Sequence, residues 1–98
     1  MPRATLILDN KFWLASGAIV QIRVWRLPTA DDEWPHGLKY SLFYGHPGER
    51  IVAYDNETGK SDHRHYRTSE EPYVFTTLEQ LVRDFERDVR REVEREGS

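Results

Sequence analysis

Cysteine is absent from this chain of 98 residues. Its absence excludes disulfide frameworks, zinc–thiolate sites and cysteine nucleophiles. Because a small secreted domain would usually need disulfides, a cytoplasmic location is expected. No apolar run approaches the length of a membrane span, so we expect no association with a membrane. The net charge of -3 argues against a general nucleic-acid coat protein.

Length and charge distribution indicate one domain with two unlike parts. A chain this short buries one modest core, so residues 1–98 are expected to form a single domain. Residues 1–67 carry a net charge of +1 and all four histidines, whereas residues 68–98 carry -4. The first part is therefore mildly basic and can gain charge near neutral pH, while the tail is acidic.

Alternation of apolar and polar residues predicts a sheet over about residues 4–75. Residues 4–9 alternate with Leu6 and Leu8 on one face, and residues 18–27 show the clearest alternation. Residues 38–44 and 50–54 are also predicted strands, and residues 60–66 are predicted to return as a polar strand. Short connections between these strands predict an antiparallel meander.

Three segments are predicted to interrupt the strands. Asn10 and Lys11 are interpreted as a turn, with residues 12–14 packing under the sheet edge. Residues 45–48 form a strong Gly- and Pro-containing turn. Residues 70–72 are interpreted as a break because they end in proline.

A long C-terminal helix is predicted over about residues 77–95. Thr76 or Thr77 fits the first position of a capping box. One apolar stripe recurs at helical spacing and consists of Leu78, Leu81, Val82, Phe85, Val89 and Val93. The predicted fold is therefore α+β, a twisted antiparallel meander of about five strands with this helix packed on one face.

The segment from Tyr54 to His65 contains the candidate catalytic residues. His63 and His65 share one face of a strand, and Arg64 points away. Imidazoles titrate near neutral pH, so such a pair can act as acid and base on a ribose 2′-hydroxyl and its phosphodiester. A neighbouring Lys60 or Arg64 can stabilise charge developing on the phosphate.

Two acids near the histidines are further candidates. Asp55 or Asp62 can orient a histidine, although Asp55 also fits a plain turn. His-x-His with either acid is a known metal-ligand spacing, but spacing fixes no third ligand. We therefore expect neither a metal nor a cofactor, and a solvated polar strand without any role stays an alternative for the whole segment.

A second candidate surface lies on the predicted open face of the sheet. Arg23 and Lys39 are placed there beside Trp25 and Ser41. Cations around an aromatic platform are typical of phosphate or RNA binding. The alternative is a solvated sheet face partly covered by one large residue.

Four blocks of sequence in order resemble one known family. They are Val24–Pro28 (VWRLP), His36–Tyr40 (HGLKY), the segment Tyr54–His65 with its Asp-Asn, Gly-Lys and Asp-His-Arg-His groups, and Glu70–Phe75 (EEPYVF). This pattern resembles the TumE family of small prokaryotic toxin–antitoxin proteins. The resemblance covers nearly the whole chain, and the third block is the distinctive one.

The resemblance implies a toxin paired with a helix-turn-helix antitoxin. By analogy with small α+β toxins, we hypothesise a metal-independent ribonuclease, so enzymatic activity is a hypothesis only. The residues assigned to proton transfer and its orientation are His63, His65, Asp55 and Asp62. The residues assigned to substrate binding are Arg23, Lys39, Lys60, Arg64 and Trp25. The alternative is a non-catalytic protein- or RNA-binding module, and a homodimer is also considered.

Overall fold

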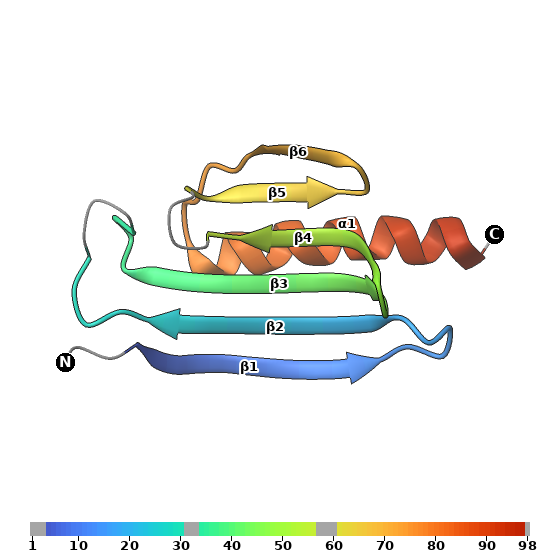
Figure 1. The fold of residues 1–98 in the computed structure, drawn as a ribbon, viewed down its shortest axis with the longest axis horizontal. Helices are drawn as coiled ribbons and strands as arrows, with labels where there is room; N and C mark the ends of the chain where they lie inside the picture. Colours follow the sequence, from blue (N-terminus) through green and yellow to red (C-terminus); the bar gives the residue numbers. More distant parts are fainter. Residues whose placement is uncertain (1–3, 31–33, 57–60, 98) are drawn as a thin grey trace.

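A computed structural model describes residues 4–30, 34–56 and 61–97. The strands form a single antiparallel sheet in which neighbours in sequence are neighbours in space, followed by one helix (Figure 1). The elements are β1 (Thr5–Trp13), β2 (Ile19–Arg26), β3 (Leu38–His46), β4 (Glu49–Asp55), β5 (His63–Tyr66), β6 (Ser69–Pro72) and α1 (Leu78–Gly97). The predicted α+β meander with a C-terminal helix is confirmed. None of the described residues belongs to a helix apolar enough to cross a membrane.

The first strand is longer than predicted. Asn10 and Lys11 pair with Ile22 and Gln21 inside β1, so their interpretation as a turn is wrong. Their backbones join the ladder to β2, and an edge strand tolerates such polar residues because only one side is paired.

A register shift between Leu6 and Leu8 shows that the prediction of one shared face for these two residues is wrong. Leu6 lies opposite Trp25, whereas Leu8 lies opposite Val24. Since residues paired across antiparallel strands share a face, the bulge turns Leu6 and Leu8 to opposite faces.

The sixth strand is also absent from the prediction, which interpreted its residues as a break. In β6, Glu70 and Glu71 lie opposite His65 and Arg64 of β5. Opposite charges across neighbouring strands favour pairing. Pro72 is the last residue of this edge strand, where its missing N–H costs no ladder bond to a further strand.

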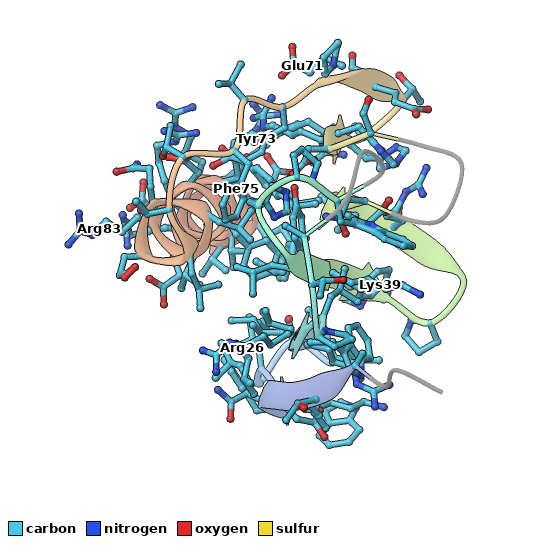
Figure 2. All side chains as sticks on the ribbon, turned by 90° about the vertical axis from the view of Figure 1, so that its left-hand side faces the viewer. Arg26, Lys39, Glu71, Tyr73, Phe75 and Arg83 are labelled. Carbon is cyan, nitrogen blue, oxygen red and sulfur yellow. The ribbon has the colours of Figure 1, made fainter. Side chains whose placement is uncertain are left out.

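The core lies between the sheet and α1, which packs mainly over β4. We call this side of the sheet the helix face and the other side the open face. Figure 2 shows Tyr73 and Phe75 on the helix face and Lys39 pointing from the open face. The largest fully buried apolar side chains of this core are Val24, Tyr40, Leu42, Tyr44, Val52, Tyr54, Leu81 and Phe85. The predicted alternation of β2 and β3 is confirmed by this burial.

The helix begins after a side-chain cap. The Gln80 backbone N–H donates to Thr77 Oγ1 at 3.0 Å, so Thr77 rather than Thr76 caps the helix. Leu81 and Phe85 are fully buried, but Val93 is 41 % exposed. The apolar stripe therefore reaches the core only in the first half of α1.

In the second half of α1, two acids face the sheet. Asp88 is fully buried, and its Oδ2 accepts hydrogen bonds from the Tyr54 hydroxyl at 2.5 Å and from Arg64 Nε at 2.8 Å. Glu92 is also fully buried and accepts from the Tyr66 hydroxyl at 2.6 Å. Polar contacts therefore continue where the apolar stripe ends.

The Asp88 carboxylate is stabilised against protonation. Burial alone would raise its pKa, but hydrogen bonds from Arg64 and Tyr54 and the nearby positive charges outweigh burial and lower it below 3.8. Arg64 also contacts Glu71 at 2.5 Å, and the hydrogen bond to Asp88 raises the Arg64 pKa. This ion pair fastens β5 to the helix in its charged form.

Removing the Asp88 carboxylate is expected to destabilise the fold strongly. Asp88→Ala leaves Arg64 and Tyr54 without their shared acceptor in a buried place, which costs about 3–5 kcal/mol of unfolding free energy. Urea denaturation followed by circular dichroism measures this loss. Glu86→Ala, at an exposed acid of the same helix, is the matched control and should change stability by less than about 0.5 kcal/mol. Equal effects of the two substitutions would contradict the role given to Asp88.

The same carboxylate predicts a pH dependence of stability. Because its folded-state pKa is depressed, its contribution is fully present above 3.8 and is lost as the pH falls through the folded-state pKa. Wild type and Asp88→Asn should therefore differ most in unfolding free energy near pH 7. The difference should shrink on acidification below 3.8. A difference that stays constant down to pH 2 would show that Asp88 does not titrate in the folded protein.

Candidate functional site

The histidine pair lies on the open face at β5. Side chains of this four-residue strand alternate, so His63 and His65 share the open face while Arg64 and Tyr66 contact the helix. The two imidazole centroids are 4.8 Å apart and the rings are nearly perpendicular. His63 is 7 % and His65 is 5 % exposed. Both rings therefore sit in the sheet surface rather than on flexible side chains in solvent.

Asp55 is the acid that the fold brings to the pair. It ends β4 directly opposite His63. Its Oδ1 lies 2.6 Å from His63 Nε2. The other ring nitrogen, Nδ1, lies 2.8 Å from the Ser61 carbonyl oxygen. A carbonyl oxygen only accepts, so Nδ1 carries a hydrogen and Nε2 is the nitrogen turned to the acid.

The contact between Asp55 and His63 has an unusual feature. Although the two atoms are close, Asp55 Oδ1 is buried and makes no hydrogen bond of acceptable geometry. The contact is therefore an electrostatic one that is not aligned with the ring N–H.

His65 has looser contacts than His63. Its Nε2 is 3.9 Å from Asp55 Oδ2, and its Nδ1 is 3.8 Å from Glu70 Oε2. Burial lowers the pKa of His65, the charge of Arg50 lowers it further, and the two acids act in the opposite direction. Neither ring nitrogen is held by a short hydrogen bond, so this imidazole is open to exchange a proton. Glu70 was not expected here because β6 was not predicted, and the effect of Arg50 depends on the register between β4 and β5.

Asp62 lies elsewhere. Its Oδ2 accepts from the Tyr40 hydroxyl at 2.7 Å and contacts His36 Nε2 at 2.8 Å. The Leu38 N–H donates to His36 Nδ1 at 3.3 Å, so Nε2 of that ring carries the hydrogen. Phe75 stacks on His36 at 3.9 Å. Asp62 thus serves a cluster on the helix face, and the fold does not bring it to His63 or His65.

The remaining basic candidates are divided by the sheet. Arg64 is on the helix face, tied to Asp88 and Glu71, and is therefore separated from the histidines. Lys60 lies outside the described residues. Arg23 and Lys39 are on the open face, as the alternation of β2 and β3 predicted.

A row of side chains links Arg23 to the histidines. Across β2, β3, β4 and β5, the register places Arg23, Ser41, Asp55 and His63 next to one another. Adjacent strands are about 4.8 Å apart, so the row crosses the open face in three strand spacings. Arg23 lies 5.2 Å over the ring of Trp25 and 3.4 Å from Asp9.

Lys39 extends the positive surface to a second tryptophan. Its Nζ lies 5.9 Å from the Trp34 ring centroid, and Trp34 donates its indole N–H to the Asn56 carbonyl at 2.7 Å. Asn56 is fully buried and bonds the backbones of Leu38 and Tyr40. These hydrogen bonds attach the end of β4 to the beginning of β3. The open face therefore combines two cations, two aromatic platforms and the acid–histidine cluster.

Two kinds of chemistry suit the cluster of Asp55, His63 and His65. Two imidazoles beside a carboxylate can give and take protons at neighbouring positions. The same three residues each offer a ligand atom, and these atoms lie within 4.8 Å of one another. They are therefore also the residues that can hold a metal ion.

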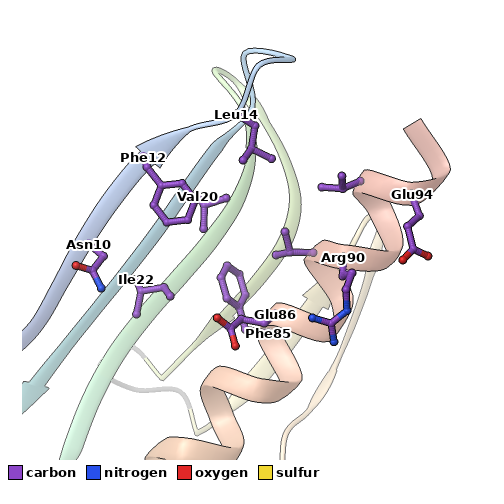
Figure 3. A pocket seen from close by; sticks show the side chains of 11 residues that line it. Asn10, Phe12, Leu14, Val20, Ile22, Phe85, Glu86, Arg90 and Glu94 are labelled. Atoms are coloured by element: carbon purple, nitrogen blue, oxygen red, sulfur yellow. The ribbon is translucent and has the colours of Figure 1, made fainter. Parts of the chain in front are cut away.

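A different surface is hollowed on the helix face. A groove of about 450 Å³ runs between the first two strands and the second half of α1 (Figure 3). Phe12, predicted to pack under the sheet edge, is instead 49 % exposed at this groove, and Val93 is 41 % exposed. The apolar lining comes from Phe12, Leu14, Val20, Ile22, Phe85, Val89 and Val93, and the charged rim from Glu86, Arg90 and Glu94.

The chain was compared with family models, with curated proteins and with solved structures. A family model described as "Toxin TumE" matches residues 3–93, which is nearly the whole chain. No curated protein and no solved structure matches the chain.

Proposed function

The chain belongs to the TumE toxin family, and from that membership we propose that it is the toxin of a toxin–antitoxin pair and cleaves RNA by metal-independent proton transfer. The observation that carries this proposal is the cluster of Asp55, His63 and His65 on the sheet face that also bears Arg23 and Lys39. A toxin family implies a cognate antitoxin. That this antitoxin has a helix-turn-helix fold is part of the proposal.

In the proposed reaction, His65 is the general base. Its ring nitrogens have only long contacts of 3.8 and 3.9 Å, so it is free to take the proton of a ribose 2′-hydroxyl. The 2′-oxygen then bonds to the adjacent phosphorus. The bond from phosphorus to the 5′-oxygen breaks, which leaves a 2′,3′-cyclic phosphate.

His63 is the general acid of the same reaction. It gives a proton from Nε2 to the departing 5′-oxygen. Nδ1 keeps its own hydrogen, which it donates to the Ser61 carbonyl oxygen. Asp55 Oδ1, 2.6 Å from Nε2, orients this ring.

Substrate binding is assigned to the open face. Arg23 and Lys39 would contact phosphates, and Trp25 would stack on a base. Lys60 keeps its proposed phosphate contact on the basis of sequence alone. Arg64 and Asp62 are left out of the proposed chemistry because both are engaged on the helix face.

Single-stranded RNA cleavage by the purified protein in excess chelator tests this proposal. Wild type is expected to release a 2′,3′-cyclic phosphate, and an oligonucleotide lacking the 2′-hydroxyl should stay intact. His65→Gln and His63→Gln should each reduce the rate by about 10²–10⁴-fold, because each removes one proton-transfer group.

His46→Gln is the matched control, since His46 lies at the end of β3 and contacts only Glu96 among described acids, at 4.0 Å. Its rate should equal that of wild type. A double variant His63→Gln/His65→Gln that cleaves as fast as wild type would refute the proposed roles, provided that its circular dichroism spectrum is unchanged.

The second candidate function is a non-catalytic binding module. The observation in its favour is the apolar groove on the helix face, with Phe12 and Val93 partly exposed in it. Because the family implies a cognate antitoxin, we take an apolar segment of that antitoxin as the occupant of the groove. This binding would leave the open face uncovered.

Substitutions in the groove are expected to weaken antitoxin binding. Phe12→Gln and Val93→Gln should each raise the dissociation constant at least about tenfold, as for a buried apolar contact at an interface. Trp13→Gln is the matched control, because Trp13 neighbours Phe12 but faces the open side opposite Ile19 and is 63 % exposed. Calorimetry with the purified antitoxin measures all three.

If Trp13→Gln weakens binding and the groove variants do not, the antitoxin binds the open face instead. A second copy of this chain is the other possible occupant of the groove. Sedimentation of the toxin alone measures whether it forms such a homodimer. The homodimer stays a prediction of the sequence until that measurement.

A further inference from the structure

Three ligand atoms in the histidine cluster lie at spacings that suit one metal ion. Asp55 Oδ1 is 2.6 Å from His63 Nε2, and Asp55 Oδ2 is 3.9 Å from His65 Nε2. Each of the three residues offers one ligand atom, and these three atoms lie within 4.8 Å of one another. Tetrahedral coordination with bonds of about 2.0–2.1 Å separates ligand atoms by about 3.4 Å. The two observed distances, 2.6 and 3.9 Å, lie on both sides of this value.

The surroundings of the imidazoles prepare them as ligands. His63 donates Nδ1–H to the Ser61 carbonyl, which leaves Nε2 as the nitrogen that faces Asp55. His65 has the Glu70 carboxylate 3.8 Å from its Nδ1, on the side away from Asp55. Metal-bound histidines usually have such a carbonyl or carboxylate at the second nitrogen, which fixes the ring and its tautomer.

The unsatisfied oxygen of Asp55 is an independent observation. Oδ1 is buried and lacks a hydrogen bond, although His63 Nε2 is only 2.6 Å away. Buried polar atoms are rarely left without a partner. A cation bound by both atoms would satisfy this oxygen and the nitrogen together.

From these observations we infer that Asp55, His63 and His65 form a binding site for a Zn²⁺-like transition-metal dication. Two imidazoles and one carboxylate favour such ions over Mg²⁺, which prefers oxygen ligands. Three protein ligands leave further coordination positions for water. The carboxylates of Asp55 and Glu70 offset the nearby charge of Arg50.

The metal would occupy the same nitrogens that the proposed ribonuclease uses for proton transfer. A bound dication therefore excludes the proton, and metal occupancy would switch cleavage off. Only this inhibitory effect rests on the proposed function, whereas the site itself rests on the geometry of the three residues.

Titration of the tag-free full chain with Zn²⁺ tests the site directly. Competition against a zinc-binding dye should report one ion per chain, with a raised melting temperature because the ion binds the folded state. Asp55→Asn, His63→Gln and His65→Gln should each weaken binding at least about 100-fold. Glu70→Gln should weaken it about tenfold, as for an outer partner of a ligand.

Two controls distinguish this site from nonspecific metal binding. His46→Gln should bind Zn²⁺ as wild type does, and Mg²⁺ should not displace the ion. In wild type, NMR of the ring nitrogens should show zinc-dependent chemical-shift changes for His63 and His65 and none for His36 or His46. Because this measurement uses wild-type protein, it does not depend on the folding of a variant. Equal zinc affinity in wild type and the three ligand variants, or no change at the His63 and His65 rings, would overturn the inference.

RNA cleavage in the same samples distinguishes the two proposals. If Zn²⁺ binds and suppresses cleavage, and chelator restores it, both are supported. Zinc binding by a protein that cleaves no RNA under any condition leaves the metal site standing and refutes the ribonuclease. Cleavage without zinc binding refutes the metal site alone. Cleavage that requires Zn²⁺ supports the site and overturns both metal independence and inhibition.

Discussion

The contact between Arg64 and Asp88 holds the two layers of this protein together where the apolar core ends. Leu81 and Phe85 attach the first half of α1 to the sheet, but the second half presents Asp88 to β5. An ion pair in a buried place has a strict geometry, because both charges lose their water and need each other's hydrogen bonds. It therefore fixes which side of β5 faces the helix. Once that side is fixed, alternation sends His63 and the other histidine of β5 to the open face.

The two faces of the sheet consequently have different chemistry. On the helix face, carboxylates are matched with tyrosine hydroxyls and guanidinium groups, and burial together with these carboxylates raises the pKa of Tyr54 and Tyr73. Tyr54 and Tyr73 therefore keep their hydroxyl protons near neutral pH and serve the fold. On the open face, burial lowers the pKa of His65, whose ring nitrogens have only long contacts with Asp55 and Glu70. At the proposed metal site, a proton and a metal ion would therefore compete for the same ring nitrogens.

Much of the fold follows from pattern, and less of the site does. The alternation of β2 and β3, the cap at Thr77 and the shared face of the two histidines could be predicted, because each depends on residues close in sequence. The partners of Asp55 and Asp62 depend on register between strands, which short-range pattern does not fix. For the same reason β6 was missed, since its acids are favoured only by the basic strand opposite. Burial of Asp88 contradicts its polarity and is explained by its hydrogen bonds from Arg64 and Tyr54.

The shortness of β5 has a consequence for how such proteins can diverge. Four consecutive positions hold both the histidines and the residues that fasten the helix, with no neutral position between them. An inherited change at Arg64 must be accompanied by a change at Asp88, and a shift of one residue in the strand would exchange the two sets of side chains. The four positions of β5 and their helix partners are therefore coupled, and a change at one of them alters both the site and the attachment of the helix.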